Sequence, residues 1–245
     1  MIVSDRHRYV FIELPLSGTT AISSELCELY GGKKLLGKHA TYRDFLKHAT
    51  PEQKNYYVFS GLRNPLDRAV SHYEKYRTDH RGRFTDPKKL GVRRGIYGRL
   101  DKHADLTRFR YIQKHGDSFA DYFMRFYKLP YDNWSRLDHE KFDYVIRFES
   151  IQDDFSTVLS QLGIDQVRPL PIANKTAKRD MNWQSYFDDA ARRRARQVFG
   201  PFMEKWGYQF PSEWGECEIK SRDRLLFEIL GKVRSFIWIY LRPAR

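Results

Sequence analysis

The chain has 245 residues, of which 41% are hydrophobic and 16% aromatic, and it carries a formal net charge of +13 at pH 7. This length and hydrophobic content allow a sizeable core, which excludes a wholly disordered protein and fits one domain with or without an appendage. The positive charge favours an anionic partner, such as nucleic acid, an acidic lipid surface, a polyanionic sugar or the phosphates of a nucleotide.

Cysteine content and apolar runs bear on the compartment. Cys27 and Cys217 are too few and too far apart for a zinc site or a disulfide framework, so a reducing compartment is expected. The sequence has no run of about 18 apolar residues, the length that a membrane span needs. No apolar signal segment precedes Tyr9. We therefore expect a protein in the cytoplasm or on the inner face of a membrane.

The first predicted elements are a buried strand at residues 9–14 (YVFIEL) and a helix over residues 20–30, joined by a turn. The turn places the backbone N–H groups of Gly18, Thr19 and Thr20 at a helix N-terminus, which favours an anion. The pattern G-x-x-x-x-G-K-[ST] is absent, so this is not an ordinary ATPase or GTPase loop. A simple helix cap is the alternative interpretation.

A second strand-to-helix turn follows. After a short helix at 41–48, residues 56–62 predict another buried strand, and Pro65 suits the first turn of a helix that runs to about Tyr76. Arg63 ends the strand, and arginine holds phosphate well through paired donors. Ser71 lies two turns along the helix and adds a hydroxyl. Two such turns suit a nucleotide that is phosphorylated at both ends.

The region after the second turn is strongly basic. Between Arg63 and Lys114 the sequence has 15 Lys or Arg residues against 6 Asp or Glu. We predict a basic loop over residues 80–102, which either meets an anionic partner or is simply solvated. Helical segments are expected around 105–128.

The remaining elements complete an α/β pattern. Residues 143–148 predict a third strand, and 151–162 and 182–206 predict helices. Strands that alternate with helices and that are continuously apolar are typical of a central parallel sheet flanked by helices on both faces.

The C-terminal segment, 213–245, differs from the predicted domain at 1–212. Its apolar residues recur with helical spacing, at 226, 229, 230, 233, 237 and 240. Its basic residues are Arg222, Arg224, Lys232, Arg234, Arg242 and Arg245. The pattern predicts a basic amphipathic helix that could lie on an anionic membrane. The alternative is a helix docked on the core or on a dimer partner.

The two turns carry a resemblance. "PLSGTT" at 15–20 and "RNPLDRAVSHY" at 63–73 resemble the paired signature of sulfotransferases that use 3′-phosphoadenosine 5′-phosphosulfate (PAPS). The segments 142–164 and 170–176 are similar to later parts of that family, and the likeness spans residues 9–210.

The resemblance implies a P-loop-like nucleotide-binding sulfotransferase fold and a set of PAPS-binding residues. Arg63 and Ser71, eight residues apart, would hold the 3′-phosphate. The 5′-phosphosulfate would be held by the first turn, Pro15, Leu16, Ser17, Gly18, Thr19 and Thr20. A loop containing Asn174, Lys175 and Thr176 would close over the nucleotide.

The sequence departs from the family at Leu16, where Lys or Arg is usual. That cation would stabilise charge on the bridging oxygen as the sulfuryl group leaves. Either another cation fills the space, such as Lys175, Lys178 or a residue of the basic loop, or the site is slow or inactive. A non-catalytic PAPS-binding or membrane-surface protein with a degenerate site is therefore the alternative function.

Two residues are candidates for the base that takes the proton of the acceptor hydroxyl. His39 is the first, because imidazole titrates near neutral pH. Its alternative role is to cap the helix that starts at Thr41. Glu13 is the second, and its alternative role is a strand-end carboxylate paired with a basic neighbour.

The combined prediction is a PAPS-dependent sulfotransferase that sulfates a hydroxyl of a carbohydrate or glycolipid, with PAPS as donor co-substrate and without a metal. No nucleic-acid partner is expected, because no recognised RNA- or DNA-binding module is visible. Animal carbohydrate sulfotransferases of the secretory pathway ordinarily carry an N-terminal membrane anchor, so we expect a bacterial enzyme, with membrane association through the tail.

Overall fold

The computed structural model describes residues 1–14, 17–90, 95–116, 118–130, 141–171, 182–216 and 218–240. The chain forms two compact units. The sheet unit is built from Met1–Asn64 and Trp134–Lys175, and the helical unit from Pro65–Asn133 and Thr176–Ala244.

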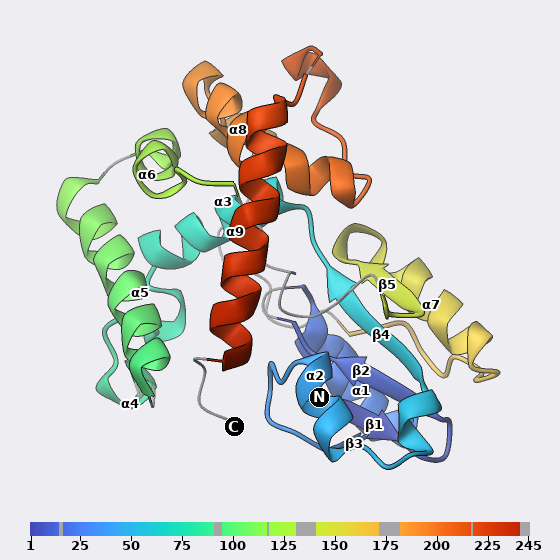
Figure 1. The fold of residues 1–245 in the computed structure, drawn as a ribbon. Coiled ribbons are helices and arrows are strands. Elements are labelled where there is room, and N and C mark those ends of the chain that lie inside the picture. Colours follow the sequence, from blue (N-terminus) through green and yellow to red (C-terminus); the bar gives the residue numbers. More distant parts are fainter. Residues whose placement is uncertain are drawn as a thin grey trace. The chain divides into compact units, whose positions relative to one another are not determined.

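A five-stranded mixed sheet, in the order β3-β1-β2-β4-β5, forms the centre of the sheet unit (Figure 1). Its strands are β1 (Ile2–Ser4), β2 (Tyr9–Ile12), β3 (Lys33–Lys34), β4 (Tyr57–Leu62) and β5 (Tyr144–Arg147). The three strands predicted from the sequence are β2, β4 and β5, and they are parallel. The prediction of a wholly parallel sheet was wrong, because β1 pairs antiparallel with both β2 and β3.

The reason for the mixed edge is the short connection between β1 and β2. Only residues 5–8 join the two strands. A connection of this length can close a hairpin, whereas a parallel crossover needs a dozen or more residues. Both parallel connections are long enough for helices: α1 (Thr19–Leu29) and α2 (Tyr42–His48) lie between β2 and β4.

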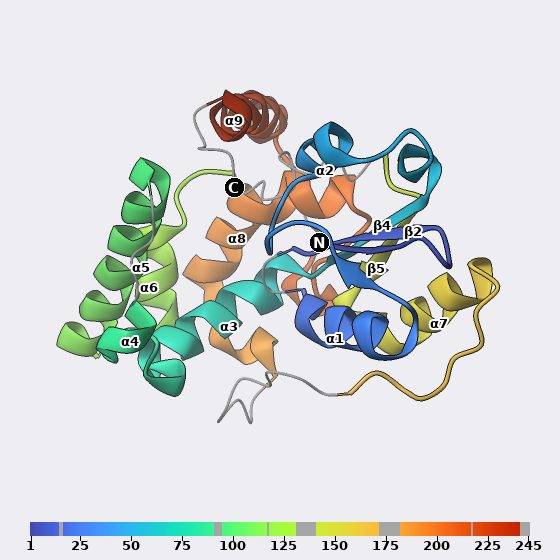
Figure 2. The same ribbon diagram turned by 90° about the horizontal axis from the view of Figure 1, so that it is seen from below.

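Helices cover both faces of this sheet, as predicted. Figure 2 shows α1 and α7 (Ile151–Gln161) on one face and α2 on the other. The apolar residues of α1 and α7 form one buried cluster with the strands; it includes Phe11, Ile22, Leu26, Phe59, Phe155, Val158 and Leu159. This packing fixes where β2 and α1 meet, and hence the position of the first turn.

The helical unit is organised around aromatic side chains. Its helices are α3 (Pro65–Arg77), α4 (Pro87–Leu90), α5 (Gly95–His115), α6 (Phe119–Phe126), α8 (Asp189–Lys205) and α9 (Ser221–Tyr240). Tyr73, Phe119, Phe123, Phe187 and Phe199 belong to one buried cluster. Phe119 and Phe187, for example, meet edge to face with ring centroids 4.7 Å apart. Much of the chain's aromatic content therefore serves packing.

The basic segment predicted as a loop is largely helical. α4 and the start of α5 lie within residues 80–102. Pro87 begins α4, where proline is well tolerated because the first N–H of a helix needs no partner. The basic side chains Arg81, Arg83, Lys88, Lys89 and Arg99 are exposed along this segment.

The helix α9 lies within the predicted C-terminal segment and packs on α8 (Figure 1). Phe227 is buried, and Arg224 forms an ion pair with Glu204 at 2.8 Å. The opposite side of α9 exposes a stripe of apolar residues: Leu225, Ile229, Val233, Phe236 and Tyr240. Among the described residues, no helix is long and apolar enough to cross a membrane.

Candidate active site

Gly18 shapes the first turn, between β2 and α1. It is the N-cap of α1 and has φ of 71°, in the left-handed region that disfavours residues with a Cβ. The space is also closed. A Cβ on Gly18 would lie 2.6 Å from Cδ1 of Ile151 and 3.0 Å from the Phe148 ring. Only glycine therefore fits this position.

Two hydroxyls of the first turn are used to hold the turn itself. Thr19 Oγ1 donates to the carbonyl oxygen of Leu14 at 2.8 Å, and Ser17 Oγ donates to the same oxygen at 3.5 Å. Both side chains are buried. A Cβ on Gly61 of β4 would lie 3.0 Å from the Ser17 carbonyl oxygen, so the turn lies close against β4. Pro15 and Leu16 lie outside the described residues.

Thr20 is the half-exposed hydroxyl of the turn, and it contacts a lysine. Lys38 Nζ donates to Thr20 Oγ1 at 3.1 Å. Lys38 comes from the connection between β3 and α2, 18 residues away in the sequence. It was not among the cations proposed to replace the one absent at Leu16; Lys175 and Lys178 lie outside the described residues. The nearest sequence signal was its position directly before His39.

His39 is held in an unusual backbone conformation. Its φ is 65°, which is uncommon for a residue with a side chain and often marks a functional position. His39 Nδ1 lies 3.0 Å from the carbonyl oxygen of Glu13. Because a carbonyl only accepts, Nδ1 carries the hydrogen in this contact, and the lone pair is then on Nε2. This is the tautomer that a proton acceptor needs at Nε2.

The helix-capping role considered for His39 belongs to Thr41. Thr41 Oγ1 accepts from the Asp44 N–H at 3.2 Å, and Asp44 Oδ2 accepts from the Thr41 N–H at 2.9 Å. This reciprocal capping box satisfies the start of α2.

Glu13 is buried and its carboxylate is already paired. The Met1 ammonium lies 2.5 Å from Oε2, and Ser23 Oγ donates to Oε1 at 2.7 Å. Burial alone would raise the pKa of Glu13. The Met1 ammonium and the Ser23 hydroxyl stabilise the charged form more strongly, so the pKa lies below its usual value. A carboxylate of low pKa is a poor proton acceptor, and the geometry therefore favours His39.

Arg63 and Phe148 define the second turn, after β4. The Arg63 guanidinium lies over the Phe148 ring, 4.2 Å from its centroid. A guanidinium that stacks on a ring donates from its N–H edge, and this geometry suits a planar or tetrahedral anion. Next to it, the Asn64 N–H donates to Glu149 Oε1 at 2.7 Å.

Phe148 was not identified from the sequence, although it lies in the segment that resembles the family's later strand-helix unit. Its ring is beside the position of Gly18 and beneath Arg63. It therefore contacts residues of both turns at the carboxyl ends of the parallel strands.

The other predicted residues are distributed differently. Ser71 is buried in α3 of the helical unit, whereas Arg63 belongs to the sheet unit. Asn174, Lys175 and Thr176 lie outside the described residues. Within the described ranges, no three His, Cys, Asp or Glu side chains gather as ligands of a metal ion.

A family model described as "Sulfotransferase family" matches residues 1–204. The match contains both turns and most of the described elements, and leaves α9 outside. No curated protein and no solved structure shows a significant match to the chain.

Proposed function

Because the chain belongs to the sulfotransferase family, we propose that it transfers a sulfuryl group from PAPS to a hydroxyl of a carbohydrate or glycolipid. One observation supports the choice of PAPS as the donor. Neighbouring parallel strands each end in a turn suited to an anion, with Gly18 after β2 and Arg63 after β4. A ligand with anionic groups at two ends matches this pair, at the strand edge where α/β sheets usually bind ligands.

The proposed reaction is an in-line displacement at sulfur. The acceptor oxygen forms a bond to sulfur while the bond from sulfur to the bridging oxygen breaks, and that electron pair stays on the 5′-phosphate. His39 Nε2 takes the proton of the acceptor hydroxyl. Arg63 and the N–H groups at the start of α1 hold the two anionic ends. The chemistry needs positioned donors and cations rather than a change of oxidation state.

The proposed acceptor class rests on charge. The helical unit exposes Arg81, Arg83, Lys88, Lys89 and Arg99 within one short stretch of sequence. Such a concentration of positive charge attracts anions at long range and suits an acidic saccharide.

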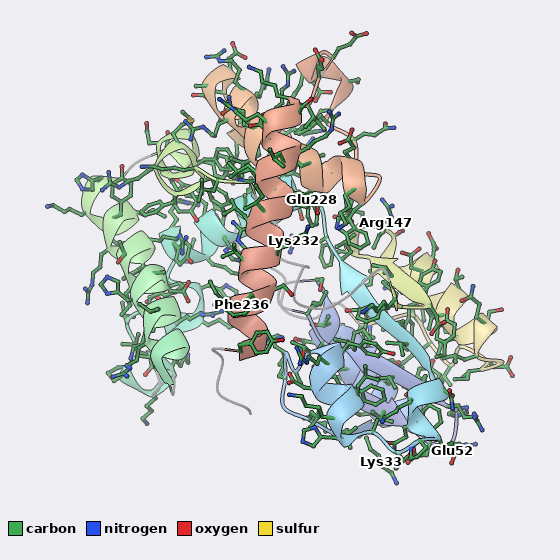
Figure 3. The ribbon with its side chains drawn as sticks, in the orientation of Figure 1. Lys33, Glu52, Arg147, Glu228, Lys232 and Phe236 are labelled. Atoms are coloured by element: carbon green, nitrogen blue, oxygen red, sulfur yellow. The ribbon has the colours of Figure 1, made fainter. Side chains whose placement is uncertain are left out.

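We further infer that α9 binds the surface of an anionic membrane. The exposed stripe includes Phe236, which is 59% exposed, and Lys232 lies along the same side of the helix (Figure 3). Apolar residues flanked by cations suit the boundary between headgroups and acyl chains. Co-sedimentation with vesicles containing phosphatidylserine should be lost in Ile229→Ser/Phe236→Ser. Unchanged sedimentation, or a stripe that instead mediates dimerisation, would overturn this inference.

The donor is tested by calorimetric titration with adenosine 3′,5′-bisphosphate. The intact protein should bind it, and Arg63→Ala should weaken binding about tenfold to hundredfold, as expected for a lost charge-assisted contact. Arg6→Ala is the matched control, because Arg6 is exposed before β2, at the opposite end of that strand from the first turn. If the intact protein does not bind the bisphosphate, the proposed donor is wrong. Binding without sulfuryl transfer to any saccharide would favour the non-catalytic alternative.

A further inference from the structure

We propose that Lys38 supplies the cation that the first turn lacks, and that it acts on the 5′ end of the donor. This inference rests on the proposed function and goes beyond it by assigning a catalytic residue from a different loop. The turn itself, Ser17 to Thr20, contains no basic residue. Yet negative charge develops on the bridging oxygen as the sulfuryl group leaves, and a positioned cation stabilises that charge.

The contact with Thr20 places the lysine at the start of α1. Thr20 lies in the first turn of the helix, and the Lys38 ammonium is 3.1 Å from its hydroxyl. The first N–H groups of a helix have no partner within the helix, so an anion held there would also be within reach of this ammonium.

The electrostatics of this arrangement point to an anionic ligand. The N-terminus of a helix carries partial positive charge, and acidic side chains are the usual neighbours there. α1 has no acidic residue in its first turn, and a lysine lies beside it instead. The Lys38 ammonium also stabilises the charged form of the Glu13 carboxylate. The positive end of the helix and the lysine together favour an anion at the start of α1.

The loop that carries Lys38 is held at two points. Lys38 contacts Thr20, the last residue of the turn, and His39 contacts the carbonyl oxygen of Glu13, before the turn. The left-handed backbone at His39 allows the two neighbouring side chains to reach these separate places. One short loop therefore brings together a cation for the leaving group and a base for the acceptor.

The assignment predicts selectivity between ligands. Lys38→Met should weaken binding of adenosine 3′,5′-bisphosphate about tenfold and leave binding of adenosine 3′-monophosphate, which lacks the 5′ group, unchanged. It should also lower kcat for sulfuryl transfer about 100-fold, because the cation stabilises the charge that develops on the bridging oxygen in the transition state. The control is Lys33→Met, because Lys33 is exposed on the edge strand β3 and points away from the sheet unit (Figure 3).

A second variant adds the cation at the position where the sequence lacks it. Leu16→Lys in the Lys38→Met background should restore at least part of kcat. If Lys38→Met and Lys33→Met bind and react alike while the intact protein binds the bisphosphate, the role of Lys38 is wrong and the proposed donor stands. If the intact protein binds neither nucleotide, the proposed function itself fails. Equal weakening of both nucleotides in Lys38→Met would indicate a general structural effect and would also overturn the assignment.

Discussion

The turns after β2 and β4 follow neighbouring parallel strands but are built differently. The turn after β4 carries its own cation, Arg63, which an aromatic ring supports. The turn after β2 is made of small residues whose buried hydroxyls hold its backbone, and its cation, Lys38, comes from another loop. The cation of the turn after β4 can therefore be identified from a local motif, whereas the lysine beside the turn after β2 is found only in the tertiary structure.

The largest effect is expected from a change in the loop that contacts the first turn. His39→Asn should lower kcat about 100-fold or more, because a general base is lost. Asparagine tolerates the left-handed backbone, and its amide can still donate to the Glu13 carbonyl. Binding of adenosine 3′,5′-bisphosphate, measured by calorimetry, should therefore stay unchanged. An unaltered kcat would show that His39 only positions the loop.

The next largest effect is expected from a substitution that changes the shape of the first turn. Gly18→Ala should reduce the free energy of unfolding by about 2 kcal/mol, because the left-handed backbone and the contact with Ile151 are both unfavourable. Urea denaturation measures this loss. Ile151→Val removes the Cδ1 atom, so the same substitution in that background should be less damaging. Equal losses in both backgrounds would mean that the backbone alone requires glycine.

Arg63→Lys tests what the guanidinium contributes at the second turn. It keeps the charge but removes the planar group that stacks on Phe148, so affinity for the bisphosphate should fall about tenfold. Adenosine 3′-monophosphate should lose affinity by the same factor, in contrast to Lys38→Met. Arg6→Lys serves as the control, and calorimetry gives both affinities. A loss confined to the bisphosphate would place Arg63 at the 5′ end.

The smallest effect concerns the buried carboxylate beside the first turn. The pKa of Glu13 is lowered in the folded protein, so its charged form stabilises the fold at pH values above its ordinary pKa. This contribution is lost as the pH falls through the ordinary and then the lowered pKa. Glu13→Gln should therefore flatten the decrease in unfolding free energy as the pH falls through and below the ordinary glutamate pKa of about 4.3. Urea denaturation at a series of pH values measures this, and an equal decrease in unfolding free energy with pH in the two proteins would contradict this role.

The sequence predicts the strands that are continuously apolar and the turns that a glycine or proline marks. β2, β4 and β5 have such runs, and Gly18 and Pro65 mark where the following helices begin. β1 and β3 were missed because three and two residues are too short to show a period. The start of α5 was missed because glycine and charged residues, which favour loops, dominate it.

The site could be predicted only where its residues share a local motif. Arg63, Gly18 and His39 each follow from a pattern within a few residues. The contact between Lys38 and Thr20, and the position of the Phe148 ring under Arg63, arise from packing between distant segments. No periodicity or spacing within one segment encodes such contacts, so the structure was needed to find them.

The docking of α9 on α8 bears on how the helical unit would be oriented on a lipid surface. The helix is fastened to α8 by the pair between Arg224 and Glu204 and by the buried ring of Phe227, so it is not a free tether. A bilayer that took up the exposed stripe would therefore fix the tilt of the helical unit and its height above the headgroups.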